Sequence, residues 1–266
     1  MGYILVTNDD GVDSPALLPL VRAVGRLAPV RVVCPARERS WIGKAITRWE
    51  EIAVESVERE GVEITAVHGF PADCTNLAVH SLFPDPPELV VAGVNIGLNA
   101  GLGFFLSSGT VGAAMEAWIA GLPALAFSVG RPGRDREWKQ AWAQTEGQDL
   151  WKRAAEISAD IVRRVRDAGF PSGVDLINVN FPLDANLETR RAVTRLARIG
   201  YDRLFRQKGE GVFVHDFAGA IQPDAALDGT DVAAVMNGWV SITPVSLAHT
   251  AELSPELREA LRAGPG

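Results

Sequence analysis

Cysteine is scarce in this sequence, and the few cysteines present have no metal-binding pattern. Cys34 and Cys74 are the only two, and they do not form a CxxC pair. Isolated cysteines of this kind supply neither a disulfide framework nor a cysteine zinc site. Long apolar runs are missing too, because none reaches the roughly 18–20 residues that span a bilayer. The first residues lack the basic region of a signal peptide, so we expect a cytoplasmic protein that does not bind membranes.

An excess of positive charge is also lacking. The chain has 26 lysines and arginines against 33 aspartates and glutamates, for a formal net charge of −7. A duplex-binding protein needs a basic footprint, so we expect no nucleic-acid polymer as a partner. A small anionic substrate stays open, because one bound cation reverses the local electrostatic field. The hydrophobic share of 47% is high enough for a sizeable core.

What is present is an alternation of short apolar runs with segments of helical spacing. This alternation predicts an α/β protein with a Rossmann-like, doubly wound and mostly parallel sheet. We expect Ser14 to cap the first helix ahead of Pro15. The expected strands are 3–7, 30–34, 63–67, 88–93, 124–128 and 176–180. The expected helices are about 17–27, 72–82, 109–120 and 150–165, with a polar surface crossing at 131–148.

The pattern divides the chain into three parts. Residues 1–189 are expected to form the α/β catalytic body. Residues 190–231 have strand-like stretches, mixed charges and glycines, which is typical of a β-rich arm that projects from the α/β body. Residues 232–266 make a C-terminal extension, with a returning strand at 232–243 and a short helix at 255–262.

Ligands of open parallel sheets bind beyond the carboxyl ends of the strands, so residues that follow strands are the first site candidates. The first strand is followed by Asp9 and Asp10. The second leads into a loop with Ser40, and the fourth into a loop with Asn95 and Asn99. Adjacent carboxylates repel each other unless a positive charge lies nearby, and oxygen ligands of these kinds suit Mg²⁺ or Mn²⁺. We therefore expect one divalent cation per subunit, held by the two aspartates, Ser40 and Asn95.

The segment Ser108-Gly109-Thr110 opens an apolar, buried helix. The free N–H groups and the positive dipole end of a helix start attract anions, and glycine allows close approach. If this start faces the same sheet edge as the acidic pair, the two features form a site for metal-assisted phosphoryl transfer. Ordinary structural roles stay open for both features. Ser108 is a good N-cap, and Asp10 or Asp13 in a solvated turn would cap the helix that follows them.

Several separated motifs give the sequence a resemblance to a known family. They are ILVTNDDG at 4–11, PARERS at 35–40, PADCT at 71–75, VAGVNIGLN at 91–99, SGTVGAAME at 108–116, GTD at 229–231 and VSITP at 240–244. In this order they resemble the SurE family of survival-protein nucleotidases, and the match covers most of the chain.

The resemblance implies a 5'/3'-nucleotidase, an acid-phosphatase-like phosphoric monoester hydrolase. Such an enzyme hydrolyses nucleoside 5'- and 3'-monophosphates to nucleoside and phosphate, sometimes with activity on short polyphosphate. The family's metal ligands match Asp9, Asp10, Ser40 and Asn95, and the two aspartates are then the catalytic residues. Its phosphate contacts match Asn99, Ser108, Gly109 and Thr110. Members are homodimers or homotetramers joined through an extended arm and exchanged C-terminal elements, so the resemblance implies that residues 190–231 are an oligomerisation hairpin.

The sequence departs from the family pattern beside the expected site. Trp41 stands where glycine is usual, and the stretch 102–107 is apolar where an acidic residue and a tyrosine are usual. This stretch suits a pocket wall, core packing or a subunit contact equally. Two other functions stay open: a non-catalytic nucleotide-binding or sensor protein, and a metal hydrolase of another phosphate ester class. For the reaction itself we favour direct attack by water over a phosphorylated aspartate.

Overall fold

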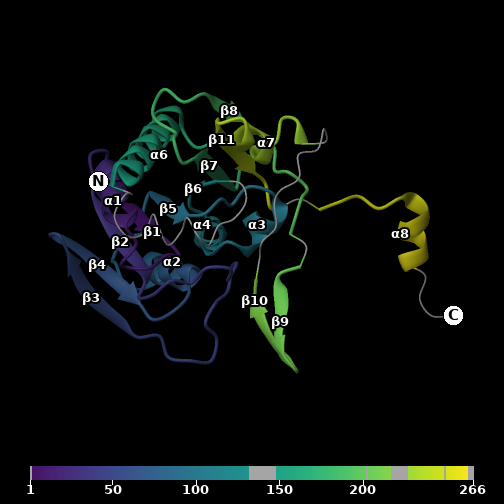
Figure 1. The fold of residues 1–266 in the computed structure, drawn as a ribbon, viewed down its shortest axis with the longest axis horizontal. Coiled ribbons are helices and arrows are strands. Elements are labelled where there is room, and N and C mark those ends of the chain that lie inside the picture. Colours follow the sequence, from purple (N-terminus) through teal and green to yellow (C-terminus); the bar gives the residue numbers. More distant parts are fainter. Residues whose placement is uncertain (1, 132–147, 202, 217–226, 249, 263–266) are drawn as a thin grey trace.

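The computed structural model describes residues 2–131, 148–201, 203–216, 227–248 and 250–262. Over these ranges the main sheet has nine strands in the order β3-β4-β2-β1-β5-β6-β7-β11-β8 (Figure 1). The central strands run parallel, and they are β4 (Val62–Val67), β2 (Val30–Pro35), β1 (Ile4–Thr7), β5 (Leu89–Ile96), β6 (Ala124–Gly130) and β7 (Leu176–Pro182). The α/β class with a mostly parallel sheet, predicted from the sequence, is confirmed.

Antiparallel pairing appears at both edges of this parallel centre. At one edge β3 (Val54–Arg59) pairs antiparallel with β4. At the other, β11 (Val240–Val245) pairs antiparallel with β7, and β8 (Arg191–Val193) continues parallel to β11. The strand order reverses at β1, which lies between β2 and β5. The carboxyl ends of these three strands therefore meet at a topological switch point, where α/β sheets bind ligands.

Helices cover both faces of the sheet (Figure 1). One face carries α1 (Leu17–Val24) and α6 (Gln148–Ala168), and the other carries α2 (Pro71–His80) and α4 (Gly109–Ile119). Successive side chains of a strand point to opposite faces, so Ile4 of β1 belongs to the first core and Leu5 to the second. None of the helices in the described ranges combines the length and apolar character that crossing a bilayer requires.

The returning strand predicted at 232–243 is wrong in its first half. The structure has α7 (Asp231–Met236) there, followed by β11. Thr230 decides the start of this helix, because its side chain accepts a hydrogen bond from the Ala233 N–H as an N-cap. Residues 232–236 are continuously apolar, which fits a strand as well as a helix, but capping and the packing of α7 against β11 and β7 favour the helix.

Two further local predictions differ from the structure. Ser14 does not cap α1, because the helix begins at Leu17 without a side-chain cap. The Leu17 N–H donates to the Ser14 carbonyl at 3.1 Å, so the chain makes a turn before the helix begins. The Ser14 hydroxyl is buried and has no hydrogen-bond partner within the described residues. The apolar stretch at 102–107, for which no helix was predicted, forms the short helix α3 (Leu102–Ser107).

The predicted arm divides between two places. β9 (Phe205–Gly209) and β10 (Val212–His215) form an antiparallel hairpin that projects from the body (Figure 1), whereas β8 pairs within the main sheet. Helix α8 (Pro255–Arg262) lies away from the body and has no buried residue. Residues 132–147 of the predicted crossing and 217–226 of the arm lie outside the described residues. The three-part division and the role of the arm in assembly stay predictions.

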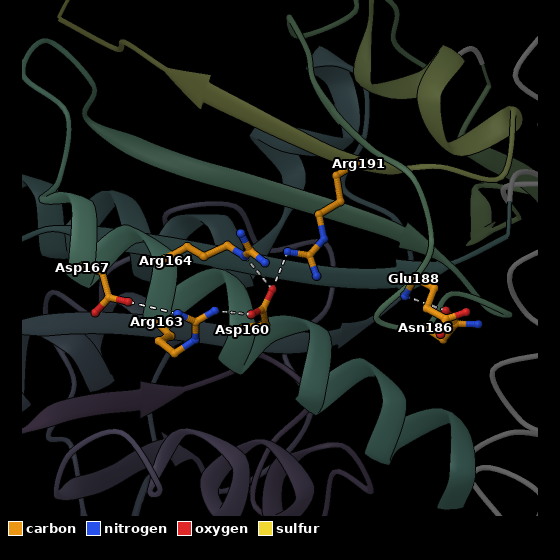
Figure 2. Close-up of polar contacts among 7 residues, drawn as sticks. All are labelled: Asp160, Arg163, Arg164, Asp167, Asn186, Glu188 and Arg191. Atoms are coloured by element: carbon orange, nitrogen blue, oxygen red, sulfur yellow. Dashed lines mark hydrogen bonds and ion pairs between the residues drawn. The ribbon is translucent and has the colours of Figure 1, made fainter.

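Asp160 joins helix α6 to the edge of the sheet (Figure 2). Its Oδ2 accepts hydrogen bonds from Arg164 at 2.8 Å and from Arg191 of β8 at 2.6 Å. Its Oδ1 accepts one from Arg163 at 2.8 Å. Burial raises the pKa of this carboxyl, but the three hydrogen bonds outweigh burial and hold the pKa well below its usual range.

Asp160→Asn should lower the free energy of unfolding at pH 7 by about 2 kcal/mol, because a charged acceptor is lost. A depressed folded-state pKa gives stabilisation that is present above the ordinary value of 3.8 and is lost as pH falls through the folded-state pKa. In urea unfolding, the difference from wild type should therefore shrink below pH 3.8. Asp167→Asn removes an exposed partner of Arg163 and should change stability by less than about 0.5 kcal/mol. Equal losses in the two variants would contradict the prediction.

Candidate active site

The loop after β1 is shaped by two of its own residues. The buried Asn8 side chain donates to the Gly11 carbonyl at 3.0 Å and accepts from the Gly11 N–H at 3.1 Å. Gly11 has φ +88°, and a Cβ there would lie 2.8 Å from the Arg37 carbonyl carbon, so glycine is required. The Arg39 N–H donates to the Asp9 carbonyl at 2.7 Å and joins this loop to the loop after β2. Asn-Asp-Asp-Gly is therefore a preformed turn at the switch point.

The Asp9 carboxylate packs against the start of α4. Asp9 is 3% exposed, and its Oδ1 accepts a hydrogen bond from Thr110 Oγ1 at 2.5 Å. A Cβ on Gly109 would lie 2.8 Å from Asp9 Cβ and 3.0 Å from Asp9 Oδ2, so glycine lets the helix start approach the carboxylate. The Asp10 carboxylate is hydrogen-bonded to strand β5, because its Oδ2 accepts a hydrogen bond from the Ile96 N–H at 3.1 Å.

Asn95 and Ser40 bring neutral oxygens to the same region. Asn95 is buried near the end of β5, and its Nδ2 donates to the Gly97 carbonyl at 2.6 Å. Within the described residues, no hydrogen bond reaches Asn95 Oδ1. Ser40 Oγ donates to Glu38 Oε1 at 2.6 Å. Glu38 was missed by the sequence analysis, although its position two residues before Ser40 in the same loop was an available signal.

A buried polar layer holds Asn99 in place. Its Nδ2 donates to Ser128 Oγ of β6 at 2.7 Å. Its N–H donates to Asn180 Oδ1 at 2.8 Å, and its carbonyl accepts from Asn178 Nδ2 at 2.9 Å, both from β7. Sequence analysis did not single out these supporting residues. The signal was two asparagines two positions apart in an otherwise apolar strand, which places both on one face of the sheet.

The hydroxyls at the start of α4 have structural partners. Ser108 Oγ accepts a hydrogen bond from the Val111 N–H at 3.1 Å, so the N-cap role left open for Ser108 is present. A hydroxyl that accepts in this way keeps its own hydrogen for a ligand. The Thr110 hydroxyl differs, because its hydrogen is donated to Asp9.

A small cavity opens among these residues. Its volume is about 40 Å³, room for an ion with a few waters but not for a nucleoside. The predicted site residues that line it are Asp9, Ser40, Asn95, Asn99 and Ser108. The other three are not in its lining: Thr110 is fully buried against Asp9, Gly109 abuts Asp9, and Asp10 is bonded to β5. The structure therefore brings the predicted set to one place but gives its members different tasks.

The cavity has negative rather than positive side-chain charge. Asp9 is in its lining, and among the described residues that line it there is no lysine or arginine. Lys44, from the loop after β2, is engaged elsewhere, because its Nζ forms an ion pair with Glu116 of α4 at 2.6 Å. A phosphate dianion entering this cavity would meet a carboxylate and no cationic side chain, so its charge needs another source of compensation.

A family model described as Survival protein SurE matches residues 4–203, which include every strand end that forms this cavity. This chain belongs to the SurE family. The 5'-nucleotidase SurE of Methanocella arvoryzae is 38% identical over 264 residues, which cover 97% of each chain. The 5'-nucleotidase SurE of Archaeoglobus fulgidus is 34% identical, over 96% of this chain and 95% of that one. The crystal structure of the SurE protein from Aquifex aeolicus has a TM-score of 0.75 at 30% identity, covering 98% of this chain and 100% of that one.

In this SurE-family chain, Asp231 ties the C-terminal part to the loop that carries Asn99. Its Oδ2 accepts from the Gly101 N–H at 2.8 Å, and its Oδ1 accepts from the N–H groups of Ala197 and Val232, each at 2.9 Å. Burial raises the pKa of this carboxyl, against the lowering effect of these hydrogen bonds. The motif Gly-Thr-Asp at 229–231 thus supports the site from outside the cavity.

Proposed function

We propose that this protein is a divalent-metal-dependent nucleotidase, which hydrolyses nucleoside monophosphates to nucleoside and phosphate. The observation that carries the proposal is the cavity itself. A carboxylate and neutral oxygen donors meet the N-terminus of α4 there, with no lysine or arginine among the described lining residues. Such a cavity accepts a phosphate dianion when a cation is bound beside it. The relatives from Methanocella arvoryzae and Archaeoglobus fulgidus, both named 5'-nucleotidase, support this reading.

The residues present fit a hard cation. Asp9, Asp10, Ser40 and Asn95 offer oxygens alone, and Asn95 Oδ1 accepts no hydrogen bond from the described chain. In the described ranges no three His, Cys, Asp or Glu side chains gather to hold a metal, so the donors would be two carboxylates with neutral oxygens. This set favours Mg²⁺ or Mn²⁺ over softer metals. When bound, such a cation neutralises charge on the phosphate and lowers the pKa of a water molecule.

The protein's own groups have separate tasks in this proposal. The N-terminus of α4 aims a fixed dipole at the phosphate oxygens. Ser108 donates its free hydroxyl hydrogen to one of them, and Asn99 donates the Nδ2 hydrogen that Ser128 does not use. Thr110 is a positioning residue, because its hydroxyl is committed to holding the Asp9 carboxylate. Water then displaces the nucleoside from phosphorus directly.

The proposal also covers the range of substrates, the oligomeric state and the location of the protein. Because its volume of about 40 Å³ encloses only the phosphate end of a substrate, we propose activity on 5'- and 3'-monophosphates and on short polyphosphate. We also propose a homodimer or homotetramer, in which the β9–β10 hairpin and α8, both projecting from the body in Figure 1, make the contacts. The cytoplasm is the proposed location.

The deciding experiment uses chelator-stripped protein and a panel of nucleoside 5'- and 3'-monophosphates, with Mg²⁺ or Mn²⁺ added back separately. Phosphate release should be absent without metal and appear on addition of either ion. Binding of nucleotide without release, in protein shown to be folded, would instead support the sensor alternative. Faster cleavage of a phosphodiester than of the matching monoester would support a hydrolase of another class.

A further inference from the structure

Strand β7 carries two asparagines on one face of an otherwise apolar strand. Asn178 and Asn180 are both fully buried, at 0% exposed. The residues between and beside them, Ile177, Val179 and Phe181, point to the opposite face and belong to the core under α1 and α6. Strands that are buried on both faces are usually apolar throughout, so the two amide side chains need a physical explanation.

Each of these asparagines uses only one of its two polar side-chain atoms. Asn178 Nδ2 donates to the Asn99 carbonyl at 2.9 Å, and Asn180 Oδ1 accepts from the Asn99 N–H at 2.8 Å. The other two atoms, Asn178 Oδ1 and Asn180 Nδ2, are buried and have no hydrogen-bond partner among the residues that the structure describes. The orientation of both amides is fixed, because a backbone carbonyl only accepts and a backbone N–H only donates. Within the described chain, both side chains therefore bond to Asn99 alone.

This arrangement is unfavourable for the stability of the sheet. A buried amide oxygen or amide hydrogen without a partner loses its contacts with water and gains no bond in return. Leucine has nearly the shape of asparagine, and at these two positions it would add apolar area to the core instead. The two asparagines are therefore poor choices for the sheet itself, and the residue that gains from them is Asn99.

The loop that carries Asn99 has glycine on both sides. Gly97 has φ +138° and Gly101 has φ +84°, values that glycine adopts easily. Ser128 of β6, which lies beside Asn180 in the sheet register, accepts a further hydrogen bond from Asn99 Nδ2 at 2.7 Å. Three side chains of the sheet thus hold the N–H, the carbonyl and one amide hydrogen of Asn99, which lines the cavity.

We propose that Asn178 and Asn180 are positioning residues, which hold the Asn99 backbone so that the amide hydrogen left over by Ser128 meets the phosphate of the substrate. The inference rests on the proposed nucleotidase function and adds to it two residues that do not line the cavity. The unpartnered atoms in β7 are the cost of this placement, as is common where a fold serves a site. Phosphate binding should therefore depend on both asparagines, whereas the stability of the fold should not.

The test replaces each asparagine by leucine, which keeps the shape of the side chain and removes both polar atoms. In Asn178→Leu and Asn180→Leu, kcat/KM for a nucleoside monophosphate with Mn²⁺ should fall by about 10-fold or more, and inhibition by inorganic phosphate should weaken in parallel. Mn²⁺ binding, measured by calorimetry, should stay within about threefold of wild type, because its ligands are not moved. Unchanged kcat/KM in both variants, or equal losses of phosphate and Mn²⁺ binding, would overturn the proposal.

Thr243→Val is the matched control. Thr243 of β11 lies beside Asn178 in the sheet register and is 1% exposed, but its hydroxyl bonds to Thr194 at 2.8 Å and not to Asn99. Loss of this buried hydrogen bond should lower the melting temperature and leave kcat/KM within about twofold of wild type. Equal losses of kcat/KM in Thr243→Val and Asn178→Leu would show that any damage to this layer acts alike, and would refute the positioning role.

Asn180→Asp keeps the atom that bonds to Asn99. In either protonation state aspartate has an oxygen that accepts the Asn99 N–H, so this variant should recover most of the kcat/KM that Asn180→Leu loses. A folded Asn180→Asp protein without any recovery would contradict the proposed hydrogen bond. If a leucine variant does not fold, Asn178→Ala and Asn180→Ala take its place with the same expected losses.

Calorimetry with inorganic phosphate separates this inference from the nucleotidase proposal. If folded wild type with Mn²⁺ releases no phosphate from any nucleoside monophosphate, the nucleotidase proposal fails. The positioning role is then still supported if wild type binds inorganic phosphate and both leucine variants bind it about 10-fold more weakly, with equal Mn²⁺ affinity. It is overturned if wild type and the leucine variants bind phosphate equally, or if none of them binds it.

Discussion

Asp9→Asn should reduce kcat/KM for a nucleoside monophosphate by about 10³-fold or more while the protein stays folded. Asparagine has nearly the same shape as aspartate, and its Oδ1 can still accept the Thr110 hydroxyl that bonds Asp9 Oδ1 at 2.5 Å. What the variant loses is the negative charge inside the cavity, and with it the main attraction for a cation. Calorimetric titration with Mn²⁺ should therefore show weakened binding in parallel with the loss of turnover.

Asp13→Asn is the matched control for this variant. Asp13 lies in the same stretch of chain but is exposed and pairs with Arg59 of β3 at 3.0 Å. Exposed ion pairs of this kind contribute little to the stability of the fold, and Asp13 does not line the cavity. Activity of Asp13→Asn should therefore stay within about twofold of wild type. Full activity of Asp9→Asn with unchanged Mn²⁺ binding would remove the metal assignment. Loss of folding in Asp9→Asn, detected by circular dichroism, would require the same comparison with Asp9→Glu.

The convergence of the candidate residues could be predicted because it depends on a few strong local signals. Apolar runs of strand length fix the parallel sheet, and the carboxyl ends of such strands meet at one edge. Asp9 and Ser40 follow strands, and Asn95 lies near the end of one, that are neighbours of one another in the sheet, so their convergence needs no knowledge of side-chain contacts. Gly109 could be placed for the same reason, because it begins the helix that follows β5 and α3.

The tasks of individual residues could not be predicted, because these depend on contacts between distant segments. The bond from the Thr110 hydroxyl to a carboxylate 101 positions away in the sequence is one such contact, and the phosphate contact expected of Thr110 stays a prediction. The support of Asn99 by Asn178 and Asn180 is another contact of this kind. Capping was misjudged at Ser14, where a turn precedes the helix, and the N-cap at Thr230, which favours α7 over a strand, was not predicted. Hydrophobic periodicity alone does not resolve such competition between local and tertiary interactions.

Gly109→Ala should reduce kcat/KM by about 10²-fold, although alanine is intrinsically the better helix former. A methyl group at Gly109 would lie 2.8 Å from Asp9 Cβ and 3.0 Å from both Asp9 Oδ2 and Pro71 Cγ. Asp9 is held by its bonds to Thr110 and Arg39, and Pro71 begins α2, so neither neighbour can move freely. The helix start must therefore withdraw from the carboxylate, and a displacement of about 1 Å costs activity on this scale.

Gly209→Ala is the matched control for Gly109→Ala, since a Cβ at Gly209 meets no atom within 4 Å and its φ is not positive. Activity within about threefold of wild type in Gly109→Ala would contradict the close approach of helix and carboxylate. The two site variants also separate charge from position. Asp9→Asn removes the charge and should weaken Mn²⁺ binding, whereas Gly109→Ala keeps the charge and should weaken inhibition by inorganic phosphate more than Mn²⁺ binding. Because both act on one contact, the double variant should lose less than the product of the two single losses.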